Sequence, residues 1–348
     1  MTHSRQTSPI DGIAYGASQA ARVAWFAGHY VAGRRVLKPL PKPAQPIGPV
    51  PDRRELAGAM LDLFRNDWAN IAAGLYDPPA AAPGNPLRVL ARSRAYFRDL
   101  PAVDRRRHGE RGTTPVDDPA FADLPRYFRQ NFHHQSGGYL SEESARLYDL
   151  QVEVVFAGAA DAMRRQMLAP LARHLHGRNT RLMALLDIGC GTGRLLGMIR
   201  RNWPGLRLTG VDLSAPYLAE ARRRLGASSR LKLIAAPGEA LPLADASQDA
   251  ITCAFVFHEL PAQVRAQVAA EMARVLRPGG IVVLLDSLQL GDRPGWDGLL
   301  DLFPHHFHEP YYADYVRADL PALFGRHGLR PVETRLAYLA KIVVFAPA

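Results

Sequence analysis

The stretch Leu185–Arg200, "LLDIGCGTGRLLGMIR", decides the fold of this chain. An apolar run ends in Asp187, three glycines follow at alternate positions (Gly189, Gly191 and Gly193), and a helical pattern begins directly after them. Glycine allows positive φ and a close backbone approach, and the first amide groups of a helix can hold a ligand. The stretch therefore predicts a strand, a ligand-binding loop and a helix.

Short apolar runs on either side of this loop predict a sheet. After a long helical run at 142–175 they alternate with helical patterns, which predicts βαβ units and strands covered on both faces. The fold class that follows is α/β, a doubly wound, mostly parallel seven-stranded sheet of Rossmann-like type with a helical N-terminal extension. The predicted strands read "MALLDIG", "LRLTGVDL", "LKLIAA", "DAITCAFVF", "GGIVVLLDS", "VETRLAYL" and "AKIVVFA".

A carboxylate at the end of the second predicted strand points to a nucleoside-type cofactor. Asp212 follows Gly193 by 19 residues, where it can accept hydrogen bonds from both hydroxyls of a ribose. The glycines run GxGxG, whereas the nicotinamide fingerprint is GxGxxG, which disfavours a dehydrogenase.

The loop, Asp212 and the later stretches "GEALPLADASQDAITCAFVFHELP" and "EMARVLRPGG" together resemble the class I S-adenosylmethionine-dependent methyltransferases, particularly the ubiquinone/menaquinone C-methyltransferase-like subgroup. The resemblance implies S-adenosyl-L-methionine as cofactor, with the glycines near its methionine part, Asp187 near its ammonium group and Asp212 on its ribose. The candidate cofactor-binding residues are Asp187, Gly189, Cys190, Gly191, Gly193, Asp212, Leu213, Gly238, Glu239, Phe255 and Tyr139.

One position departs from this family pattern. Such proteins commonly place an Asp or Asn for the adenine amino group where this chain has Pro237. We therefore expect adenine contacts from the backbone around Gly238 and Glu239, or from Leu213.

Histidines mark the predicted acceptor side. "FVFHELP" leaves the fourth strand at its carboxyl end, which places His258 and Glu259 beside the reacting methyl group. We expect residues 287–325, which contain "FPHHFHEP", to form an acceptor lid whose aromatics enclose an apolar substrate. One histidine would act as base, so the catalytic candidates are His258, Glu259, His305 and His308.

Two other interpretations of the histidines stay open. They can simply satisfy backbone partners at loop corners, or His258, His305, His308 and Glu309 can form a metal site. An HExxH zinc helix is excluded because position 262 is alanine, and our favoured assignment contains no metal ligand.

Changes in amino-acid composition along the chain predict several regions that precede the sheet. We predict an amphipathic N-terminal helix at 1–36, a proline-rich linker at 37–51, a helical accessory region at 52–135, and the S-adenosylmethionine-binding domain at 136–348. The polar-aromatic stretch 127–149 precedes that domain, and Tyr139, Gln135 and His134 are candidates to close over the cofactor.

The positive charge of the N-terminal third and the aromatic residues of the first helix indicate possible binding partners. Residues 1–112 carry 17 Lys+Arg against 9 Asp+Glu, an excess that could attract nucleic acid, lipid headgroups or an anionic substrate. Because residues 14–38 contain Trp25, Phe26 and Tyr30, a peripheral membrane contact is one expectation. Only two cysteines occur and no secretory signal is visible, so we expect a cytoplasmic location, with or without membrane association.

The function that these observations favour is methyl transfer to a small, apolar or amphiphilic acceptor. A nucleic-acid methyltransferase is the first alternative, but no (D/N/S)PP(Y/F/W) motif follows the fourth strand, where the chain reads "FHEL", and no RNA-binding module is recognisable. A non-catalytic S-adenosylmethionine-binding protein is the second.

Overall fold

A seven-stranded sheet forms the centre of the computed structural model, which describes residues 8–40, 45–79, 86–109 and 118–348. The strand order is β3-β2-β1-β4-β5-β7-β6. Among these strands, β7 alone runs in the direction opposite to the other six. The predicted fold class is confirmed. The strands are β1 (Ala184–Ile188), β2 (Arg207–Asp212), β3 (Leu231–Ala235), β4 (Gln248–Ala254), β5 (Leu276–Ser287), β6 (Leu329–Ala337) and β7 (Ala340–Pro347).

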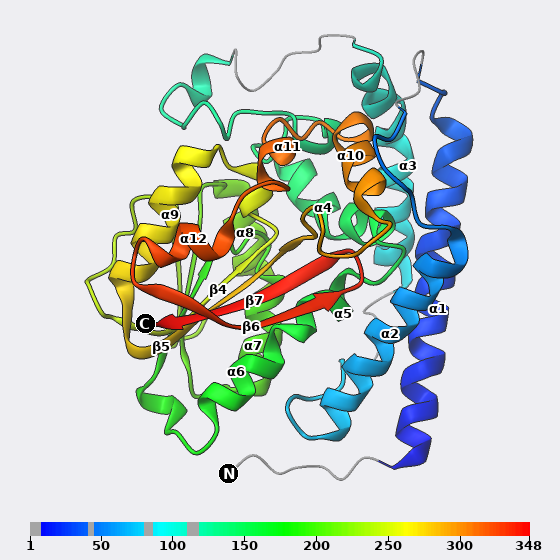
Figure 1. Cartoon of the computed structure of the whole chain (residues 1–348). Coiled ribbons are helices and arrows are strands. Elements are labelled where there is room, and N and C mark those ends of the chain that lie inside the picture. Colours follow the sequence, from blue (N-terminus) through cyan, green and yellow to red (C-terminus); the bar gives the residue numbers. More distant parts are fainter. Residues whose placement is uncertain (1–7, 41–44, 80–85, 110–117) are drawn as a thin grey trace.

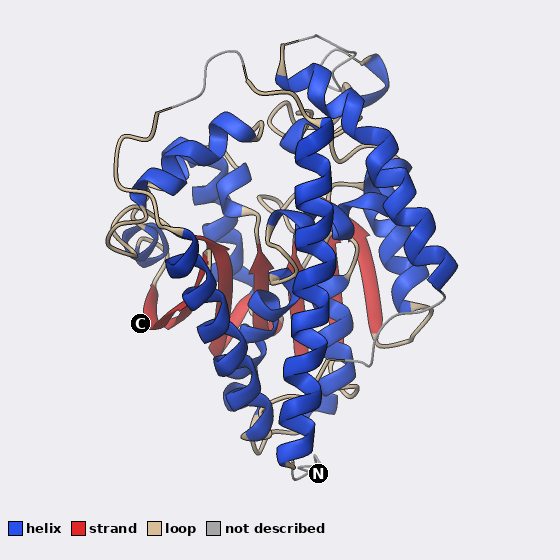
Figure 2. Ribbon diagram, turned by 90° about the vertical axis from the view of Figure 1, so that its right-hand side faces the viewer, coloured by secondary structure: helices blue, strands red, loops and turns tan. Residues whose placement is uncertain are grey.

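Helices pack against both faces of the sheet (Figure 2). Right-handed crossovers require this arrangement, because the chain order reverses between β1 and β4. All five residues of β1 are buried, as expected for a central strand of a sheet covered on both sides. The crossover helices are α7 (Arg194–Asn202), α8 (Ala215–Leu225) and α9 (Ala262–Val275).

Three helices of the N-terminal extension stand along one side of the sheet (Figure 1). They are α1 (Pro9–Val36), α2 (Arg53–Ala72) and α3 (Pro86–Arg107). Capping boxes start the first two, with Ser8 and Asp52 as N-caps. The part of the predicted first helix before residue 8, and residues 41–44 of the predicted linker, lie outside the described residues.

A buried carboxylate joins this extension to the sheet domain. Asp67 of α2 accepts hydrogen bonds from Tyr15 of α1 at 2.5 Å, from Tyr76 at 2.8 Å and from two nitrogens of Arg165. Arg165 belongs to α5 (Ala160–Gln166), and apolar residues of α1 and α2 share one core cluster with the sheet. The extension therefore packs as part of the same core.

The long helical run predicted at 142–175 is broken into three helices in the structure. These are α4 (Glu142–Val155), α5 and α6 (Leu168–Leu175). Ala157 and Gly158 both have positive φ, which a continuous helix does not allow, and the Arg22 side chain donates to the Gly158 carbonyl at 3.0 Å. The contact with α1 favours the turn over the local helical pattern.

The remaining elements are short. They are η1 (Pro119–Phe121), η2 (Phe132–His134), η3 (Thr180–Leu182), η4 (Phe257–Glu259), α10 (Asp297–His306), α11 (Tyr312–Tyr315) and α12 (Leu320–Gly325). The proline-rich segment runs along α10, where the Gly298 amide donates to the Pro49 carbonyl at 2.9 Å. Among the described residues, no helix combines the length and the apolar character that crossing a bilayer requires.

Candidate functional site

A partly open pocket lies at the carboxyl ends of β1, β2 and β4. Eight of the eleven predicted cofactor-binding residues line it, namely Tyr139, Gly189, Gly191, Asp212, Leu213, Gly238, Glu239 and Phe255. The topological position is where an open α/β sheet binds ligands.

The glycine loop has the backbone geometry that its sequence predicts. Gly189, Gly191 and Gly193 all have positive φ, at 65°, 52° and 74°. A Cβ atom on Gly189 would lie 2.4 Å from a methyl carbon of Val256, so a larger residue does not fit there. Asp212 accepts hydrogen bonds from the backbone amides of Gly191 and Ser214, both at 2.8 Å, and this fixes its carboxylate beside the loop.

Three predicted cofactor residues lie just behind the pocket wall. Asp187 is buried and accepts a hydrogen bond from Thr252 at 2.7 Å, and burial raises its pKa to about 7 although that hydrogen bond opposes the shift. Cys190 is buried and its amide donates to the Val211 carbonyl at 3.0 Å. Gly193 is the N-cap of α7.

Aromatic side chains cover the pocket. The Tyr127 hydroxyl donates to Glu239 at 2.6 Å and the Tyr139 hydroxyl donates to Glu259 at 2.5 Å, so two hydrogen bonds join the cover to the sheet edge. The sequence identified Tyr139 but missed Tyr127, although both belong to the polar-aromatic stretch 127–149. The aromatic lining residues outside the strand ends are Tyr127, Phe128, Phe132, Tyr139, Tyr148 and Tyr217.

The two other candidates of this stretch, Gln135 and His134, accept hydrogen bonds from residues outside the pocket lining. Ser144 donates to the Gln135 side chain at 2.5 Å, and Arg106 of α3 donates to the His134 carbonyl at 2.7 Å. Neither Gln135 nor His134 is among the lining residues in the described part of the chain. The extension thus positions the cover through the backbone of His134.

The predicted acceptor lid lies beside the pocket without lining it. Residues 287–325 are all described, and none of them is among the lining residues. His305 is exposed in the last turn of α10, and His308 lies 3.3 Å from Gln130 through Nε2. Tyr312 and Tyr315, in contrast, contact the His258 ring edge-on, at ring distances of 6.0 and 6.2 Å.

The two candidates that follow β4 occupy different positions. Glu259 lines the pocket, whereas His258 is buried behind it and its Nδ1 lies 2.6 Å from Asp286. Burial lowers the pKa of His258, but the Asp286 carboxylate outweighs this and raises it to about 10. Burial also raises the pKa of Glu259 to about 7, against the opposing charge of His258.

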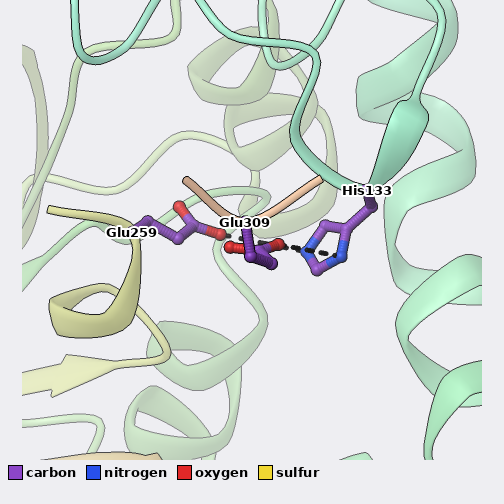
Figure 3. Close-up of side chains that lie close together, drawn as sticks. All are labelled: His133, Glu259 and Glu309. Atoms are coloured by element: carbon purple, nitrogen blue, oxygen red, sulfur yellow. Dashed lines mark ion pairs between the residues drawn. The ribbon is translucent and has the colours of Figure 1, made fainter. Parts of the chain in front are cut away.

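Two further residues, His133 and Glu309, meet Glu259 (Figure 3). His133 Nδ1 lies 3.1 Å from a Glu309 oxygen and Nε2 lies 4.0 Å from a Glu259 oxygen. The Glu309 side chain has no exposed surface, and burial raises its pKa well above the usual range. Burial lowers the pKa of His133 to about 3, which keeps this imidazole neutral. Glu309 belonged to the metal alternative considered from sequence, but His133 was missed.

Comparison with known proteins agrees with this geometry. A family model described as "Methyltransferase domain" matches residues 185–280. The chain contains a class I S-adenosylmethionine-dependent methyltransferase domain. The pocket residues fit the cofactor of this family, because the glycine loop and the Asp212 carboxylate line the same pocket.

Curated methyltransferases match part of the chain. The ubiquinone/menaquinone biosynthesis C-methyltransferase UbiE of Methylobacterium nodulans is 34% identical over 46% of this chain and 62% of the relative. The demethylmenaquinone methyltransferase of Thermus thermophilus is 38% identical over 29% of this chain and 46% of the relative. The malonyl-[acyl-carrier protein] O-methyltransferase of Xylella fastidiosa is 36% identical over 28% of this chain and 33% of the relative. The matches therefore span less than two thirds of the length of each of these relatives.

Some strained backbone positions lie at or next to the methyltransferase pocket. Among the described residues, six non-glycine residues have positive φ, and three of them are His133, His134 and Phe255. Phe255 lines the cofactor pocket, and His133 reaches Glu259, which lines it too. Residues in such conformations persist only where the surroundings hold them, and they cluster at functional sites.

Proposed function

We propose that this protein transfers a methyl group from S-adenosylmethionine to a small, apolar or amphiphilic acceptor. The observation that carries the proposal is the pocket itself, where the glycine loop and Asp212 meet an aromatic cover. An aromatic, partly enclosed wall favours an apolar acceptor and excludes water from the reacting groups.

The roles of individual residues follow from their positions. Asp212 is oriented by two backbone amides and keeps lone pairs for ribose hydroxyls. The backbone of Gly238 and the Leu213 side chain would contact the adenine ring of the cofactor. When bound, S-adenosylmethionine supplies an electrophilic methyl group. The chain contributes chiefly by positioning the acceptor in line with that group, and Glu259, with His258 behind it, lies where the acceptor would approach.

The acceptor atom is not inherited from the relatives. Their printed names include both C-methyltransferases and an O-methyltransferase, so the matched region serves different acceptors. A nucleic-acid acceptor is the less favoured alternative. Of the arginine triplet that ends α3, Arg106 donates to His134 and Ser136, and Arg107 donates to Asp104, so these two side chains already have internal partners.

Calorimetric titration with S-adenosylmethionine and S-adenosylhomocysteine tests the cofactor assignment. We expect micromolar binding that Asp212→Ala abolishes and Asp245→Ala leaves unchanged, because Asp245 is an exposed carboxylate paired with Arg274. Equal affinity in both variants would sink the proposal. Transfer of labelled methyl groups to quinol and acyl-ester panels then identifies the acceptor class.

We further propose a peripheral membrane contact through residues 14–38. One face of α1 packs on the protein, but Trp25, Tyr30 and Val31 are 42%, 47% and 55% exposed. Arg34 and Arg35 follow in the last turn, so the helix offers both apolar and cationic groups to an anionic surface. Flotation with anionic vesicles tests this proposal, and protein that stays at the bottom of the gradient refutes it.

A further inference from the structure

We propose that His133, Glu259 and Glu309 bind a divalent transition-metal ion at the rim of the cofactor pocket. These side chains come from three separate segments, at η2, η4 and the turn before α11, and they point toward one another (Figure 3). One ligand atom from each lies within 4.8 Å of the other two.

The strongest observation is the environment of Glu309. Its side chain has no exposed surface, and neither carboxylate oxygen has a hydrogen-bond partner among the described residues. His133 Nδ1 also lacks a hydrogen bond, although it lies 3.1 Å from the Glu309 oxygen. In its ionised form such a carboxylate is costly to bury, and a bound metal ion would supply the compensating positive charge.

The cluster has the chemistry of a first-row metal site. Two carboxylates and one imidazole form a mixed oxygen and nitrogen set, which suits Mn²⁺, Fe²⁺ or Zn²⁺ better than the oxygen-only set that Mg²⁺ prefers. Ligand atoms bonded at about 2.0–2.2 Å lie about 3–3.5 Å apart around the ion. His133 Nδ1 is already 3.1 Å from a Glu309 oxygen, whereas Glu259 lies 4.0 Å from the other ring nitrogen, Nε2. The His133 ring or the Glu259 carboxylate must therefore move for all three residues to bind one ion.

Other contacts hold the ligands in place. The His133 amide donates to the His308 carbonyl at 3.3 Å, which ties the segments carrying His133 and Glu309 together. Tyr139 donates to Glu259, and Arg106 donates to the His134 carbonyl beside the strained His133 backbone. Such supporting hydrogen bonds orient metal ligands and are part of the site's affinity.

The position suggests what the ion would do. Three protein ligands leave at least one coordination position open. Glu259 lines the cofactor pocket, so an open position can face it and take an oxygen atom of the acceptor. This last step rests on the proposed methyl transfer, whereas metal binding itself does not.

Titration of the metal-stripped, full-length protein with Mn²⁺ and Zn²⁺, followed by calorimetry and by Mn²⁺ electron paramagnetic resonance, tests the site. We expect one ion per chain, and a loss of affinity of about tenfold or more in Glu309→Gln and in His133→Asn. Asparagine is chosen because it tolerates the left-handed backbone of His133, where φ is 54°. The matched control is His306→Ala, an exposed histidine three residues before Glu309, which should bind the ion normally.

The outcomes separate this inference from the proposed function. The inference is overturned if the unaltered protein binds neither ion at millimolar concentration, or if both cluster variants bind as the unaltered protein does. A thermal scan with and without Zn²⁺ guards against misfolding, because the ion should raise the unfolding temperature of the unaltered protein and not that of Glu309→Gln. S-adenosylmethionine titrations of the same samples report on the cofactor pocket separately, so failure there leaves the metal result intact.

Discussion

Replacement of Asp67 by asparagine should weaken the whole fold. The Asp67 side chain has no exposed surface, and that of Arg165, its ion-pair partner, is 5% exposed. Asparagine keeps the shape but removes the charge, so the guanidinium loses its only carboxylate partner at ion-pair distance among the described residues. Removing one partner of a buried ion pair costs about 3–5 kcal/mol.

The expected shift in unfolding temperature follows from chain length. For domains of 150–250 residues, 1 kcal/mol corresponds to roughly 2–4 °C, and the lower value suits this longer chain, which gives a decrease of about 6–10 °C. Differential scanning calorimetry measures it. Asp62→Asn on the same helix is the matched control, because Asp62 pairs with Arg65 at the surface and such a pair contributes about 0–1 kcal/mol.

A result in which both variants unfold within about 2 °C of the unaltered protein would refute this reasoning. It would mean that α2 does not dock on α5 through Asp67. Limited proteolysis provides a second readout, since weakened docking should release the extension as the first fragment in Asp67→Asn and not in Asp62→Asn.

Three further predictions concern the pocket. The Asp187 carboxyl has a pKa of about 7 and must be charged to attract the cofactor ammonium. As the pH is raised toward 7, affinity for S-adenosylmethionine should therefore increase by up to roughly tenfold per pH unit, and above pH 7 it should level off. A flat calorimetric profile contradicts this prediction, and Asp187→Asn should remove the slope. Gly189→Ala should abolish cofactor binding through its clash with Val256, whereas Gly226→Ala, at the same φ of 65° with open space, should keep it. His258→Ala should lower turnover strongly with cofactor affinity nearly retained, and unchanged turnover removes His258 from the mechanism.

Local patterns were sufficient to predict the sheet and the position of the glycine loop. Buried apolar runs bounded by turns identify strands such as β1, and the alternate glycines after Asp187 permit the positive φ values that the loop adopts. The helical run at 142–175 shows the limit of this approach. Its break at Ala157 depends on a contact with Arg22, which is distant in sequence.

The acceptor side depended more on tertiary contacts. In "FPHHFHEP" the sequence could not separate the exposed His305 from the buried Glu309, because the separation follows from where α10 ends. His133 was missed for a similar reason. Its importance comes from a left-handed backbone and from Glu309 lying opposite, and neither is visible in the run "NFHHQ".

The shared core has a practical consequence for dividing the protein. A fragment beginning at residue 136 would correspond to the recognisable methyltransferase unit, yet it would retain Arg165 while discarding its carboxylate partner. It would also uncover the apolar surface that Leu63 and Ile71 of the extension now bury. Shortened versions should therefore express poorly and aggregate, and screens for activity are best run on the intact polypeptide.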